Sequence, residues 1–95
     1  MAAFVIAEQL EVTDPTKLEE YGKSVRQTIV AHGGKVVAVG NCEPVEGPWK
    51  PGRLVLIQFD NMDKAKGWYN SAEYQPLIKI RQAGSRGNLV FLNGL

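Results

Sequence analysis

The chain of 95 residues contains one cysteine, Cys42, and one histidine, His32. A single cysteine cannot form a disulfide within the chain, on which small secreted domains usually depend. We therefore expect a reducing, cytoplasmic compartment and a buried, unreactive thiol. Metal sites are built from groups of histidine, cysteine or carboxylate ligands at regular spacings, and neither residue lies in such a group. We expect no metal site and no other cofactor.

Long apolar runs and an excess of charge are also lacking. Nothing approaches the roughly 18 consecutive apolar residues of a membrane-spanning helix, and the N-terminal residues lack the basic flank and apolar run of a signal peptide. The net charge is +1 and the isoelectric point is about 7.9, so the chain carries no electrostatic footprint for nucleic acid. We expect neither a membrane nor a nucleic acid as a partner.

What the chain does contain is four apolar runs that are typical of strands, at residues 3–10, 35–42, 53–59 and 88–92. An antiparallel sheet with one face in water alternates apolar and polar residues. Three of these runs are instead apolar at consecutive positions, namely Phe4–Ala7, Leu54–Ile57 and Leu89–Leu92. They therefore predict a sheet that is covered on both faces.

Two helical regions separate the strands. Asp14-Pro15 can cap and begin the first, and Gly33-Gly34 ends it. Asn61 can cap the second, and Pro76 predicts a break with a fresh helical segment over residues 76–82. Apolar residues recur at helical spacing in both regions; they are Leu18, Tyr21, Gly22, Val25, Ile29 and His32 in the first, and Met62, Ala65, Trp68 and Tyr69 in the second.

This order of elements predicts a single α+β domain over residues 1–95, with a ferredoxin-like β-α-β-β-α-β protomer. Right-handed crossovers place both helices on one face of an antiparallel four-stranded sheet. The chain has no further element to cover the second face, so a second copy is the economical cover. We predict a homodimer through sheet-to-sheet packing, which is a dimeric α+β barrel.

The connection between the second and third strands, residues 42–53, holds the candidate catalytic pair, Glu46 and Arg53. It contains three prolines and is about twice the length of an ordinary hairpin loop, and stiff loops often carry functional residues. A carboxylate and a guanidinium at a barrel mouth can act as general base and oxyanion clamp. The alternative is an ion pair that ties the loop to the strand. Trp49 is expected to anchor this loop on the sheet edge.

Trp68, Tyr69, Ser71, Tyr74 and His32 are the candidate substrate-binding residues. The aromatic side chains form either the core and a dimer contact or a pocket wall with phenolic donors. Adjacent helical residues point about 100° apart, so we expect Trp68 to be buried and Tyr69 to lie at a boundary with its hydroxyl hydrogen-bonded. His32 ends the first helix, where an imidazole favourably meets the negative helix end, and its alternative role is in the pocket.

Over essentially its whole length the chain resembles a family of small bacterial proteins. The residues that carry the resemblance are Glu46-Gly47, Trp49, Pro51, Arg53, Phe59, Ala65, Trp68-Tyr69-Asn70-Ser71, Glu73-Tyr74-Gln75, Leu77 and Arg81. The family is domain of unknown function 1330, within the dimeric α+β barrel superfamily. The resemblance implies a ferredoxin-like protomer that pairs sheet to sheet, and it implies no reaction. Related superfamily members include cofactor-free monooxygenases, isomerases and haem-degrading enzymes.

Two functions remain open at this point. The first is a small cofactor-free enzyme that acts by proton transfer on a small organic acid or aromatic metabolite, with Glu46 as base and Arg53 holding an anionic oxygen. The second is a non-catalytic dimeric binder or accessory protein. A partly buried Glu46 without a cation at a closed pocket favours the enzyme. A solvent-exposed Glu46 paired with Arg53 favours the binder.

Overall fold

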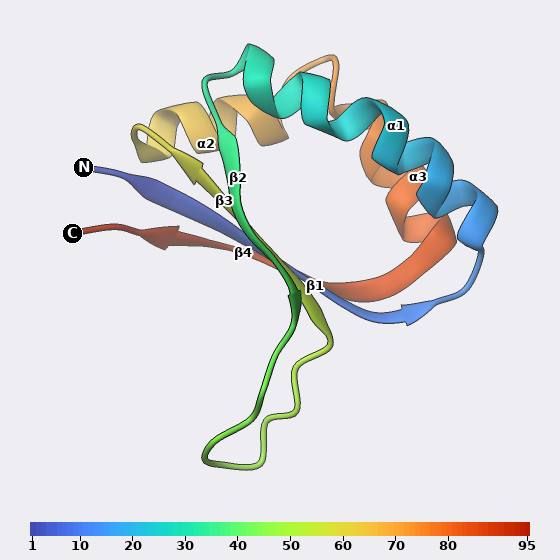
Figure 1. The fold of residues 1–95 in the computed structure, drawn as a ribbon. Helices are drawn as coiled ribbons and strands as arrows, with labels where there is room; N and C mark the ends of the chain where they lie inside the picture. Colours follow the sequence, from blue (N-terminus) through green and yellow to red (C-terminus); the bar gives the residue numbers. More distant parts are fainter.

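Four strands form one antiparallel sheet, and all three helices lie on the same face of it (Figure 1). The computed structural model describes residues 1–95. The elements are β1 (Ala3–Val12), α1 (Pro15–Ala31), β2 (Lys35–Asn41), β3 (Arg53–Phe59), α2 (Met62–Tyr69), α3 (Gln75–Gly84) and β4 (Ser85–Asn93). The strand order is β2-β3-β1-β4. The predicted ferredoxin-like α+β protomer is confirmed, with its second helical region in two pieces. No helix is long and apolar enough to cross a membrane.

The predicted signals set the helix ends. Asp14 Oδ1 accepts hydrogen bonds from the backbone N–H groups of Thr16 and Lys17, at 3.1 and 3.4 Å, and satisfies donors that the first turn leaves unpaired. Asn61 caps α2 in the same way. The expected break is present at residues 70–74, and α3 begins at Gln75 with Pro76 in its first turn, where a missing N–H costs no helical hydrogen bond.

Two strands are longer than the sequence pattern indicated, and one is shorter. β1 continues to Val12 and β4 begins at Ser85, because a register shift between Gln9 and Glu11 lets the two strands stay paired beyond the apolar run. β2 ends at Asn41, which leaves Cys42 exposed in the following loop. The expectation of a buried thiol is therefore wrong, since the edge strand ends before it.

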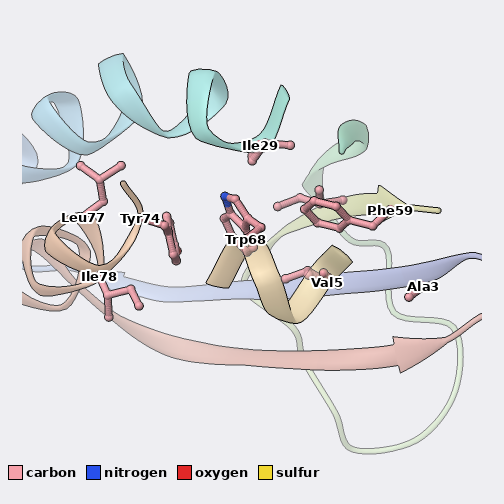
Figure 2. Packing of buried hydrophobic residues seen from close by; sticks show 10 residues of the cluster. Ala3, Val5, Ile29, Phe59, Trp68, Tyr74, Leu77 and Ile78 are labelled. Atoms are coloured by element: carbon pink, nitrogen blue, oxygen red, sulfur yellow. The ribbon is translucent and has the colours of Figure 1, made fainter. Parts of the chain in front are cut away.

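The core lies between the sheet and α2 and α3 (Figure 2). Trp68 occupies its centre with a relative exposure of 1%, as predicted. Its ring packs on Phe59 and Tyr74, at centroid distances of 5.7 and 4.0 Å. Tyr69 is half-buried against Phe91, but its hydroxyl makes no hydrogen bond within the chain. The expectation of a bonded hydroxyl at Tyr69 is wrong, because this ring lies at the edge of the aromatic cluster.

The face of the sheet without helices is apolar. Val5 and Ile57 are directly paired and point to the core, so their neighbours along each strand point to the opposite face. We call that surface the open sheet face; its apolar side chains are Phe4, Ile6, Leu54, Leu56, Val90 and Leu92, and Gln58 and Glu8 lie among them. The chain exposes 6292 Å² in total, whereas a compact monomeric protein of 10.5 kDa exposes about 5,400 Å². The protomer thus leaves more surface in water than its size requires.

Gly34, which ends the first helix, offers a test of the core. A Cβ atom at this position would lie 2.5 Å from Phe59 Cε1 and 2.8 Å from Ile29 Cγ2, which is closer than packed atoms approach. We expect Gly34→Ala to lower the free energy of unfolding by about 1–3 kcal/mol through overpacking. Urea titration measures the change. Gly67→Ala is the matched control: it lies in α2 with nothing within 4 Å of the added atom, and should stabilise by about 0.5–1 kcal/mol. Equal effects at both positions would contradict the packing argument.

Candidate functional site

A cavity of about 400 Å³ lies between α1 and the sheet. It exists because α1 packs along α3 rather than directly on the strands. Most of its lining is apolar and comes from α1, from the inner faces of β1, β2 and β3, and from Leu89 of β4. The volume falls within the range that holds a small organic molecule, roughly 300–1,000 Å³.

A cluster of polar side chains lies on the wall of this cavity. Tyr21 of α1 and Tyr74, at the entry to α3, have their hydroxyl oxygens 2.8 Å apart. Arg81, two turns along α3, donates from Nη1 to the Tyr74 hydroxyl at 3.2 Å. One phenolic proton lies between the two oxygens, so the second remains to donate to a bound molecule. The cluster therefore presents a hydrogen-bond donor and, next to it, a guanidinium.

Both phenols in the cluster remain neutral at physiological pH. Burial raises the pKa of Tyr21, against the opposing effects of its hydrogen bond with Tyr74 and of the nearby Arg81 charge. Burial also raises the pKa of Tyr74, and the neighbouring Tyr21 adds to that shift. A neutral phenol beside a guanidinium is a hydrogen-bond donor for an oxygen that carries negative charge. It is not a base at neutral pH.

The raised pKa values of the two phenols predict a loss of stability in alkali. The unfolded chain releases phenolic protons near the ordinary pKa of 10.0, whereas the folded chain retains them to higher pH. The contribution is thus fully present below pH 10 and is lost as the pH rises above it. We expect the free energy of unfolding to fall by at most about 1.4 kcal/mol per pH unit for each phenol. Urea titrations between pH 8 and 12 measure the slope. If the free energy of unfolding fell just as steeply with pH in Tyr74→Phe, the assignment of the loss to this phenol would be wrong.

Three arginines also line the cavity, and the four ion pairs of the chain use none of them. Arg81 is half-buried in the polar cluster. Arg26 of α1 and Arg53 at the start of β3 are exposed, which places them at the cavity mouth. Guanidinium groups bind carboxylates through paired hydrogen bonds. The mouth is therefore suited to an organic anion.

Glu8 is the one acidic residue among those that line the cavity, but its side chain points to the open sheet face, because it lies three residues after the inward-facing Val5. Its carboxylate is occupied there. It accepts hydrogen bonds from Asn88 Nδ2 at 2.9 Å, the Gly52 N–H at 3.1 Å and Trp49 Nε1 at 3.3 Å. These bonds, that of Asn88 above all, lower the pKa of Glu8. A carboxylate held this way is a weak base. Its evident role is to tie the base of the loop between β2 and β3 to the sheet.

The predicted site residues divide between two places. Arg53, Trp68 and Tyr74 line the cavity, whereas Glu46, Tyr69, Ser71 and His32 do not. Ser71 instead shapes the turn that positions Tyr74: its Oγ donates to the Trp68 carbonyl at 2.7 Å and accepts the Tyr74 N–H at 3.2 Å.

His32 lies outside the cavity and contacts an acidic side chain. It lies at the C-terminal end of α1, and its Nε2 is 3.2 Å from Glu73 Oε2. This contact lowers the pKa of Glu73. It joins the end of α1 to the turn before α3, outside the cavity.

Glu46 lies on the loop that extends from the sheet on the side away from the helices (Figure 1). It is exposed and makes neither a hydrogen bond nor an ion pair, so the protomer itself does not bring it to Arg53. Trp49 on the same loop is 62% exposed and touches the sheet through its indole N–H to Glu8. Trp49 therefore ties the loop to the sheet, as expected of an anchor, but through a hydrogen bond and with most of its side chain exposed.

Sequence reasoning missed three residues of the cavity. Tyr21 was part of the apolar stripe of α1 and was assigned to packing, although a tyrosine in such a stripe carries a hydroxyl that needs a partner. Arg81 stands seven residues after Tyr74, a spacing that places both on one helix face, but no role followed from it. Arg26 gave no signal in the sequence.

Comparison with known proteins agrees with this structure. The family model of the domain of unknown function DUF1330 matches residues 2–95. The chain belongs to this family. Among curated proteins nothing matches. Within the chain no three histidine, cysteine or acidic side chains lie together as metal ligands would.

Solved structures share the fold at low sequence identity. A protein of unknown function from Rhodopseudomonas palustris has a TM-score of 0.77 and 17% identity, over 99% of this chain and 82% of its own. SnoaB, a cofactor-independent oxygenase from Streptomyces nogalater, has a TM-score of 0.66 and 12% identity, over 99% and 92%. A dimeric ferredoxin-like protein of unknown function from Thermobifida fusca has a TM-score of 0.67 and 12% identity, over 99% and 92%. At these identities the likeness establishes the fold of the DUF1330 protein alone.

Proposed function

We propose that the protein is a homodimer that binds a small organic acid or aromatic metabolite in the cavity and acts on it by proton transfer without a cofactor. The observation that carries this proposal is the group of polar side chains in an otherwise apolar cavity. Two neutral phenols and three arginines without carboxylate partners face about 400 Å³ of space. Guanidinium groups that lack a carboxylate partner within the chain are free to pair with the carboxylate of a bound anion.

The arrangement suits an anion whose charge moves during reaction. Arg53 and Arg26 at the mouth would hold a carboxylate. The Tyr21–Tyr74 pair would donate to a carbonyl oxygen further inside, with the Arg81 guanidinium behind it. A base, for which Glu46 is the candidate, would take the proton from the carbon next to that carbonyl. The electron pair of the broken C–H bond then places negative charge on the oxygen, which these donors stabilise.

Dimerisation is supported by the open sheet face and by a structural relative. Val90 and Leu92 are 52% and 51% exposed in the protomer, and Ile6 and Leu56 lie beside them. The T. fusca protein with this fold is described as dimeric. Packing two such faces together would remove both apolar surfaces from water, at about 25 cal/mol per Å².

The cytoplasm is the compartment that fits this proposal. Cys42 is exposed and has no cysteine partner in its own chain. In an oxidising compartment an exposed thiol of this kind is open to oxidation and to cross-links between copies. A reducing compartment avoids both.

A non-catalytic binder is the second candidate. It is favoured by one observation: Glu8, the single acidic residue of the cavity lining, has its carboxylate on the open sheet face, where it accepts three hydrogen bonds and has a lowered pKa. The protomer therefore supplies donors and cations to a ligand, but no free base. The same cavity without a base binds an anion and does nothing further to it.

Calorimetry with aromatic and aliphatic carboxylates, each paired with its neutral amide, tests binding. We expect carboxylates to bind and their amides to bind at least about tenfold more weakly, and Arg53→Gln should remove this preference. Arg86→Gln is the matched control, because Arg86 pairs with Glu11 outside the cavity. Equal binding of acids and amides by the native protein would contradict the proposal.

A second measurement separates enzyme from binder. Keto acids that bind are incubated with the protein in D₂O, and exchange of the carbon-bound protons next to the carbonyl is followed by NMR. The enzyme should exchange them faster than buffer, and Tyr74→Phe should slow the exchange by about 10²-fold. Binding without exchange would favour the binder.

A further inference from the structure

The segment of residues 42–52, which we call the arm, is built to contact something outside its own protomer. Every residue from Cys42 to Lys50 is exposed, and the arm makes no hydrogen bond from backbone to backbone. Val45 is 94% exposed and Trp49 62%. Three prolines and the Glu8 contacts at its base nevertheless restrict its conformation. A stiff segment with apolar side chains in water is typical of an unoccupied interface.

The arm cannot serve the cavity of its own chain. The cavity lies on the helix side of the sheet, and the arm extends from the opposite side (Figure 1). Figure 2 shows the same arrangement, with the loop below the sheet and the core above it. The arm therefore extends into the space in front of the open sheet face, which in the proposed homodimer is occupied by the second copy.

The length of the arm is sufficient to pass the sheet of that second copy. Packed sheets lie about 10 Å apart, and the six residues from Cys42 to Gly47, where the arm bends, span at most about 16 Å. The arm can therefore pass the second copy's sheet, behind which that copy's cavity lies. Arg53 begins β3 directly after the arm, so the arm and the cavity mouth lie at the same end of each protomer. A two-fold axis along the strands brings each arm to the other copy's mouth.

The charges on the arm and at the cavity mouth also favour a contact between them. The arm carries two carboxylates without ion-pair partners, Glu43 and Glu46, and the cavity mouth carries two guanidinium groups without partners, Arg26 and Arg53. We propose that the arm of one copy closes the cavity mouth of the second copy, with Glu46 facing Arg53. This proposal rests on the homodimer of the proposed function. It brings a carboxylate of the second copy to two guanidinium groups that have no ion-pair partner in their own protomer.

Disulfide trapping between two differently tagged variants tests the contact. Both carry Cys42→Ser; one adds Glu46→Cys and the other Arg53→Cys. The two are mixed, allowed to exchange subunits and oxidised. We expect a cross-linked heterodimer as the main product on a non-reducing gel. Glu20→Cys, on the exposed side of α1, replaces Glu46→Cys as the matched control and should give no heterodimer band.

Three results would overturn the proposal, and sedimentation of the native protein separates the first two. A native dimer whose variants give no heterodimer band shows that the arm lies elsewhere, while the homodimer stands. A native monomer at micromolar concentration removes the homodimer and the arm contact together. A disulfide within one chain, seen in the variant that combines Glu46→Cys and Arg53→Cys with Cys42→Ser, also overturns it, because the arm then folds back on its own protomer.

Discussion

Ile6→Asp will convert the proposed dimer into a folded monomer. Ile6 lies on the central strand β1 and pairs directly with Leu56 of β3 and Val90 of β4, so it occupies the middle of the open sheet face. A two-fold interface places the substitution there twice. Each unpaired carboxylate removed from water costs several kcal/mol or is forced to take up a proton.

The effect on the dimer should be large and separable from an effect on the fold. We expect the dissociation constant to rise at least about 10³-fold, since about 4 kcal/mol corresponds to that factor. Sedimentation velocity at micromolar concentration measures it, and circular dichroism checks that the monomer is folded. Val90→Asp covers the case in which Ile6→Asp does not fold. Val90 is half-exposed in the protomer, so a carboxylate there should leave the fold intact and still disrupt the dimer.

Val30→Asp is the matched control for this experiment. Val30 is 64% exposed, against 52% for Val90, but it lies on α1, on the other side of the sheet. It should leave the association unchanged. Dimers that persist in both Ile6→Asp and Val90→Asp would show that the open sheet face is not the interface.

The fold of this chain was predictable because its local signals are strong and agree with one another. Asp14 and Asn61 cap helices as their residue types favour, and Pro76 begins a helix after a break. The strands follow the apolar runs closely. The errors lie at strand ends, where a bulge after Gln9 extends pairing through polar residues that carry no apolar signal.

The site was less predictable, because a cavity depends on how far elements stand apart. Tyr74 and Arg53 were identified from the sequence. Tyr21 has the same spacing as the core residues of α1, so its spacing alone does not distinguish it from them. It lines the cavity only because α1 packs on α3. Glu46 illustrates the opposite case. Its chemistry suggested a base, and nothing in its local sequence indicates on which side of the sheet the arm extends.

The second large effect concerns Trp68, which joins the core to the cavity. Its ring is buried between Phe59 and Tyr74, and its Nε1 donates to Thr28 Oγ1 at 2.9 Å. Thr28 Oγ1 in turn donates to the Val25 carbonyl at 2.7 Å, so α2 is joined to α1 through this side chain. Removing the indole therefore loses ring packing and a buried hydrogen bond together.

We expect Trp68→Ala to lower the free energy of unfolding by about 3–5 kcal/mol, a large part of the roughly 5–15 kcal/mol that holds a domain folded. Guanidinium titration at fixed protein concentration measures it, since association contributes to apparent stability. Trp68→Phe retains most of the ring and loses the Thr28 bond, so it should cost clearly less. A loss below about 1 kcal/mol in Trp68→Ala would place the indole outside the core. Because Tyr74 packs on this ring at 4.0 Å, a Trp68→Ala protein that still folds should also bind carboxylates more weakly, through misplacement of the Tyr21–Tyr74 pair.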